Sequence, residues 1–161
     1  MGLMSPIAWL SRLLARSFVV ATVVAACSIG QPAYGDTIDG IACDGGKNVT
    51  FQATISLWLV MGNQRIAPTS GVGSTGSSCN YWVRTEDEEG VVHIRAPHEV
   101  RPTLATFLAI WDRTIPLGSG NATEFRTAAE QGRILVNGQP VAGGAAAVQL
   151  VDGSSIELRA P

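Results

Sequence analysis

The residues best suited to chemistry lie in one stretch, which runs from Cys79 to Pro97. Its most polar part is a run of four consecutive acids, Glu86, Asp87, Glu88 and Glu89. Four carboxylates suit Ca²⁺, but calcium loops place their oxygen ligands at alternating positions. Because these acids are consecutive, their side chains point apart. We interpret them as a solvated turn that ends at Gly90.

His93 follows the acids within a short apolar run, Val91–Ile94, that is typical of a buried strand. Strand alternation places its side chain opposite Val92 and Ile94, on the side of Val91 and Arg95. We interpret it as a structural histidine. The alternative is a metal site that combines His93 with Asp87, Glu86 or His98. On an extended chain His93 and His98 would lie about 16 Å apart, so they share a metal only if the chain bends sharply.

Catalytic motifs are missing from the sequence. Nucleophilic hydrolysis needs an activated Ser or Cys, and there is no Gly-x-Ser-x-Gly motif. The Gly/Ser-rich run 70–78 lacks the Lys-Ser/Thr of a phosphate-binding loop, and we expect a flexible loop there. The sequence therefore favours a protein without enzymatic activity and without a cofactor.

The N-terminus resembles an export signal. Residues 1–35 contain Arg12 and Arg16 but no acid, followed by an apolar run over 18–29 that is shorter than the ~20 residues of a spanning helix. We predict a signal peptide over 1–35 and one exported domain over 36–161, periplasmic or secreted, with an uncleaved anchor as the alternative. Contact with a membrane is expected only through this leader or a lipid anchor.

Two cleavage sites are compatible with this leader. Val-Ala-Ala-Cys at 24–27 resembles the lipobox of bacterial lipoproteins, in which Cys27 would become the lipidated first residue. Ala-Tyr-Gly at 33–35 fits ordinary signal peptidase and would leave Asp36 first. Both remain open.

Cys43 and Cys79 are the two cysteines of the mature domain. In an oxidising compartment such a pair most simply forms a disulfide, and no Cys-x-x-Cys motif points to redox or metal chemistry. The bridge would close a loop of about 35 residues and stabilise the fold by about 3–4 kcal/mol.

The charge of the mature chain is acidic. Of the 11 basic residues two lie in the leader, which leaves nine against 13 acids. No basic segment with interleaved aromatic residues is present, so we expect no nucleic-acid partner.

The hydrophobic pattern predicts one helix-and-sheet domain. An alternating strand over 49–60 turns at Gly62-Asn63, and an amphipathic helix begins at Thr103. The remaining expected elements are strands at 65–67, 81–83, 91–94, 133–136, 139–141, 148–151 and 155–159, and a second helix at 123–131. Asn137-Gly138 is a type I′ hairpin signal. One main helix on a mostly antiparallel sheet is an α+β architecture. The late Val-Asn-Gly and Leu-Val-Asp-Gly turns resemble those of a ubiquitin-like β-grasp.

The central stretch also resembles a family of uncharacterised bacterial exported proteins with a Cys-x-x-Trp-Leu-His-Thr-His-Asp segment, a Gly-Ile-Ile-His strand and a Thr-Leu-x-x-Phe-x-x-x-Trp helix. The matching residues here are Cys79, Tyr81, Trp82, Thr85, Asp87, Gly90, Val92, His93, Ile94, Pro97, Thr103, Leu104, Phe107, Trp111 and Val136–Gly138. Members carry further histidines that suggest a metal site. This chain has Gln52, Thr54, Arg84 and Glu86 at those places, and retains His93 and Asp87.

These observations predict an exported binding or structural module of the bacterial envelope, whose partner is a protein, a glycan or a small ligand. The expected binding surface is the acidic turn with its neighbours, namely Tyr81, Trp82, Arg84, Glu86, Asp87, Glu88 and Glu89. Because Tyr81 and Trp82 point to opposite sides of a strand, we expect one of them in the core. The alternative is a metal-binding periplasmic protein that uses His93.

Overall fold

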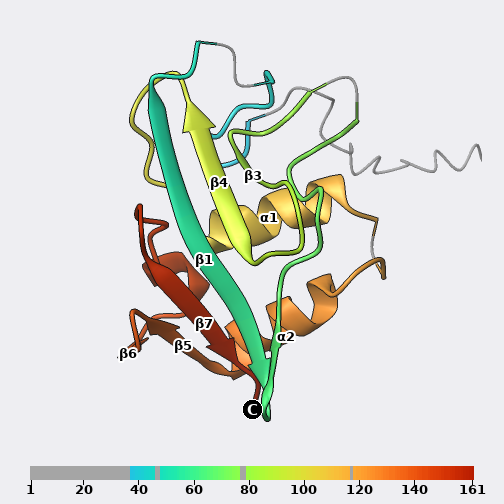
Figure 1. Ribbon diagram of the computed structural model, residues 1–161, viewed down its shortest axis with the longest axis vertical. Helices are drawn as coiled ribbons and strands as arrows, with labels where there is room; N and C mark the ends of the chain where they lie inside the picture. The colour runs from blue at the N-terminus through green and yellow to red at the C-terminus, as the bar shows by residue number, and fades with distance from the viewer. Residues whose placement is uncertain (1–36, 46–47, 77–78, 117) are drawn as a thin grey trace, which may run out of the picture. The chain divides into compact units, whose positions relative to one another are not determined.

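One long strand, β1 (Phe51–Met61), runs through the middle of a seven-stranded mixed sheet (Figure 1). The computed structural model describes residues 37–45, 48–76, 79–116 and 118–161, which form one compact unit. The predicted signal peptide, Cys27 and both cleavage sites lie outside the described residues.

The order of the strands is β3-β4-β1-β7-β5-β6, and β2 pairs with the far end of β1. Their bounds are β2 (Gln64–Ile66), β3 (Val83–Thr85), β4 (Val91–Ala96), β5 (Arg133–Val136), β6 (Gln139–Val141) and β7 (Ser155–Arg159). β1 and β7 are parallel, whereas the other pairs are antiparallel. The chain thus forms a mixed sheet whose first and last strands lie side by side.

Alternation along β1 separates the two faces of this sheet. Ala53, Ile55, Leu57 and Leu59 point inward and are at most 3% exposed. The residues between them, from Gln52 to Val60, are exposed or half-buried. This alternation is the pattern that the sequence predicts for residues 49–60.

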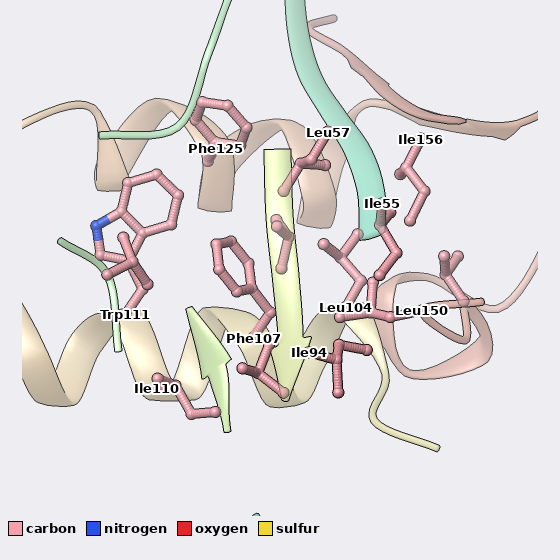
Figure 2. Packing of buried hydrophobic residues seen from close by; sticks show 14 of the residues in the cluster. Ile55, Leu57, Ile94, Leu104, Phe107, Ile110, Trp111, Phe125, Leu150 and Ile156 are labelled. Atoms are coloured by element: carbon pink, nitrogen blue, oxygen red, sulfur yellow. The ribbon is translucent and has the colours of Figure 1, made fainter. Parts of the chain in front are cut away.

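Two helices, α1 (Leu104–Thr114) and α2 (Ala122–Gln131), cover the apolar face (Figure 1). α1 begins with a capping box, since Thr103 accepts a hydrogen bond from the Thr106 amide and Thr106 accepts one from the Thr103 amide. The core lies between helices and sheet, where apolar side chains of both layers meet (Figure 2). The residues labelled there are Ile55, Leu57, Ile94, Leu104, Phe107, Ile110, Trp111, Phe125, Leu150 and Ile156.

The predicted disulfide between Cys43 and Cys79 is confirmed, with the Cα atoms 5.3 Å apart. It joins the N-terminal segment to the chain that leads into β3. Backbone pairing between Cys43 and Tyr81 and a 2.7 Å hydrogen bond from Trp82 Nε1 to Asp44 Oδ1 strengthen the same junction. The segment before β1 is therefore part of the folded domain.

The α+β architecture is confirmed, as is the hairpin of β5 and β6, where Asn137 and Gly138 have φ of 50° and 78°.

Two expectations about the fold are wrong. The described part of the Gly/Ser-rich loop is packed, since Val72 is fully buried and bonds the backbone of Thr85. The strand expected at 148–151 is instead an extended segment that pairs only at Gln149, after a short 3-10 turn. Among the described residues, no helix combines the length and hydropathy of a membrane span.

Candidate functional site

The second face of the sheet, which we call the open face, has no described helix packed on it (Figure 1). Strand register places an outward arginine on five different strands. These are Arg65 on β2, Arg84 on β3, Arg95 on β4, Arg133 on β5 and Arg159 on β7. A chain with an acidic net charge thus gathers much of its positive charge on one face.

Two of these arginines share one carboxylate at the β3–β4 side. Glu86 Oε1 lies 3.0 Å from Arg84 Nη2 and 2.9 Å from Arg95 Nη1. Arg84 is the more buried of the two, and its Nη1 has no hydrogen-bond partner among the described residues. His93 lies beside this group, opposite Thr54 of β1 and Arg84 of β3.

The other three arginines form what we call the arginine row: Arg65, Arg159 and Arg133. Val60 of β1 pairs with both Arg65 and Arg159, and Arg159 pairs in turn with Arg133, so the row crosses four adjacent strands. Glu157 bridges two of its members, 3.3 Å from Arg65 and 3.1 Å from Arg159. Arg133 is exposed and makes no ion pair with any described residue.

Trp58 lies between the arginine row and the start of β4. The Arg65 guanidinium lies 4.9 Å from the centre of its ring, which is cation–π range. On the β4 side, a Cβ at Gly90 would come within 2.6 Å of the same ring, so only glycine fits there. Gly90 also has φ of 75°, a conformation that glycine adopts without strain. Both contacts fix the indole on the open face.

The acidic turn, residues 86–89, leads directly into Gly90, and all four of its side chains belong to exposed residues. Asp87 Oδ1 accepts a hydrogen bond from the Glu89 amide at 3.0 Å, which shapes the turn. Glu86 turns back toward Arg84 and Arg95. The carboxylates of Asp87, Glu88 and Glu89 make no ion pair within the described part of the chain.

Two residues of the predicted binding surface do not belong to it. Tyr81 is 2% exposed and Trp82 is 6% exposed, so both lie in the core. The expectation that only one of them is buried is wrong because both precede β3, in a bridge with the disulfide segment, where strand alternation does not apply. The acids 86–89 remain exposed at the surface, whereas Arg84 is half-buried.

The predicted metal ligands are not brought together. His93 is half-buried on the open face, and the exposed His98 packs against the edge of Trp82 with ring centres 5.3 Å apart. Within the described ranges, no three His, Cys, Asp or Glu side chains are close enough to hold a metal ion.

A hollow of about 510 Å³ lies on the helical side, between α1, α2 and residues 143–146. Its walls are mainly small and apolar, with Ala105, Ala109 and Ala129 among them. The ion pair between Asp112 and Arg126 lies at its margin. This hollow is lined by none of the candidate site residues that the sequence predicts.

The arginine row is the feature that sequence reasoning missed. Its members lie on β2, β5 and β7, and no two are close in the chain. The available signal was weak: each occupies an outward position of an expected strand. Comparisons of the chain with protein-family models, curated proteins and solved structures found no match.

Proposed function

We propose that this protein is an exported, non-enzymatic binding module of the bacterial envelope, and that it binds through the open face of its sheet. The observation that carries this proposal is the set of five arginines on that face, with the acidic turn at its margin. Fixed guanidinium groups recognise carboxylates or phosphates with defined geometry, and Arg and Trp are enriched where interfaces gain their affinity. A protein, a glycan or a small anionic ligand would fit such a surface.

Export is supported by the disulfide between Cys43 and Cys79, since such bonds persist in oxidising compartments. Intact-mass spectrometry of the protein from its native envelope tests the export proposal. A chain that begins at Cys27 with acyl mass would be a lipoprotein, and one that begins at Asp36 would be a free protein. A full-length chain found in the cytoplasm with the thiols of Cys43 and Cys79 reduced would contradict export.

We further propose a ubiquitin-like β-grasp as the fold and the exported family described above as the relatives. The support for the fold is the strand order, in which a first strand (β1) and a last strand (β7) lie parallel at the centre and β4 and β5 flank them. The helices come between β4 and β5 in the chain, as they do in a β-grasp. The support for the family is the set of matching residues around Gly90 and His93.

Charge changes on the open face test the binding proposal. The variant Asp87→Ser/Glu88→Ser/Glu89→Ser should lose its crosslinked envelope partner while its melting temperature stays within a few degrees, because exposed charges contribute little to stability. A matched control is Glu99→Ser/Arg101→Ser, which removes two exposed charged side chains elsewhere. Unchanged crosslinking in the acidic-turn variant and in Arg133→Ser/Arg159→Ser would refute the proposal.

A further inference from the structure

We propose that a second copy of this chain binds the open face, in a two-fold symmetric dimer in which each acidic turn lies on the arginine row of the other chain. This inference deepens the proposed function, since it names the partner of the same surface. The anionic groups that the arginines bind are then the carboxylates of Asp87, Glu88 and Glu89.

The arginine row carries positive charge that its own surroundings do not balance. Among the described residues, Glu157 is the one carboxylate paired with this row, and it pairs with Arg65 and Arg159 but not with Arg133. Arg133 and Arg159 are direct partners in the antiparallel register of β5 and β7. Like charges in that position destabilise a strand pair. A carboxylate from outside the chain would relieve this repulsion.

The acidic turn has the opposite imbalance. Asp87, Glu88 and Glu89 stand next to one another, exposed and without an ion pair in the described ranges. The fold keeps them apart from the arginine row, because the Trp58 ring lies between Gly90 and Arg65. Each chain thus presents an acidic patch and a basic patch on either side of one tryptophan.

Two such patches on one face are self-complementary. In a two-fold interface the contact of residue i with residue j is repeated as the contact of j with i. An axis that passes near Trp58 would place both acidic turns on both arginine rows at once. Trp and Arg would then occupy the centre of the interface, where they most often dominate binding energy.

The open face has room for a small interface. The seven strands of the sheet hold 35 residues. At about 3.3 Å of rise per residue and about 4.8 Å between strands, they cover roughly 550 Å². This is less than the ~800 Å² that each partner buries in a standard interface and falls in the small class that weak complexes use.

Charge reversal with complementation tests the dimer. Sedimentation equilibrium of the purified mature protein should show a monomer–dimer equilibrium in the micromolar range that weakens as salt rises. Arg133→Glu/Arg159→Glu and, separately, Asp87→Lys/Glu88→Lys/Glu89→Lys should each be monomeric at the same concentrations. An equimolar mixture of the two should dimerise again, because in the mixed dimer each turn meets a row of opposite net charge. Arg101→Glu, on a side chain that is 73% exposed and lies outside the open face, is the matched control and should dimerise as the wild type does.

Two neutral variants provide a second test in case a charge reversal prevents folding. If either reversal unfolds the protein, Arg133→Gln and Asp87→Asn should each weaken dimerisation at least tenfold with unchanged circular dichroism. A wild-type protein that stays monomeric, a dimer that the open-face variants leave intact, or a mixture that fails to reassociate would each overturn the inference. If the wild type is monomeric while open-face variants still lose an envelope partner, the dimer is refuted and the proposed function stands.

Discussion

Removal of the disulfide should be the most informative perturbation of stability. The bond between Cys43 and Cys79 spans 36 positions in the sequence. In the chain-entropy model a loop of that length stabilises the folded state by about 3.5–4 kcal/mol at 25 °C, because it restricts the unfolded chain. For a domain of about 125 residues, this corresponds to a fall in melting temperature of about 12–15 °C.

The folded state itself should change little when the bond is lost. Cys43 still pairs with the backbone of Tyr81, and Asp44 still accepts the hydrogen bond of the Trp82 indole. The effect should therefore come from the unfolded chain, which expands when the crosslink is absent. In urea, the reduced protein should show a lower midpoint together with a larger m-value than the oxidised protein.

The assay compares oxidised wild type, reduced wild type and Cys43→Ala/Cys79→Ala by calorimetry and urea unfolding. Cys43 is 7% exposed, so the alanine variant also loses buried sulfur contacts, and the reduced wild type isolates the crosslink from that loss. Equal midpoints for the oxidised and reduced wild type, with the reduced mass verified, would refute the reasoning. A lower midpoint with a smaller m-value would show that the loss of stability does not come from expansion of the unfolded chain.

Three smaller changes test local features. Gly90→Ala should lower stability by about 2–3 kcal/mol and shift the fluorescence of Trp58, since a Cβ adds strain at positive φ and displaces the ring; unchanged fluorescence would contradict the contact. Gly138→Ala should cost about 1 kcal/mol in urea unfolding, because a type I′ turn needs positive φ there; a neutral result would count against that turn. Thr103→Ala should lower the melting temperature through loss of a cap worth about 1 kcal/mol, whereas Thr103→Ser should restore it; equal effects of both would place the loss outside the capping bond.

Local patterns in the sequence were sufficient to predict the elements whose residues lie close together in the chain. The alternation of Ile55, Leu57 and Leu59 predicted β1, and Asn137-Gly138 predicted the turn between β5 and β6. Each of these patterns depends on residues within a few positions of one another. Such features follow from backbone geometry and from burial of one face.

Features that depend on distant segments were not predictable in the same way. Composition favours a flexible loop at 70–78, yet Val72 is fully buried, and a Cβ at Gly73 would come within 2.3 Å of the Val83 carbonyl oxygen. Contacts with β3 and with α1, where Thr114 Oγ1 accepts a hydrogen bond from the Gly73 amide, order that segment. Tyr81 and Trp82 are both buried for a related reason, because they lie before β3 in a bridge with the disulfide segment, where strand alternation does not apply.

The arginine row shows why a site on a sheet is hard to predict from the sequence. Alternation alone assigns Arg65, Arg133 and Arg159 to the outward side of their strands. It cannot make them neighbours, since that requires β7 to enter the sheet between β1 and β5. In the sequence, only the resemblance of the late turns to those of a β-grasp points to this insertion, which brings together strands about 100 positions apart. The charge of an open sheet face is therefore a property of strand order, and a net acidic chain can still present a basic surface there.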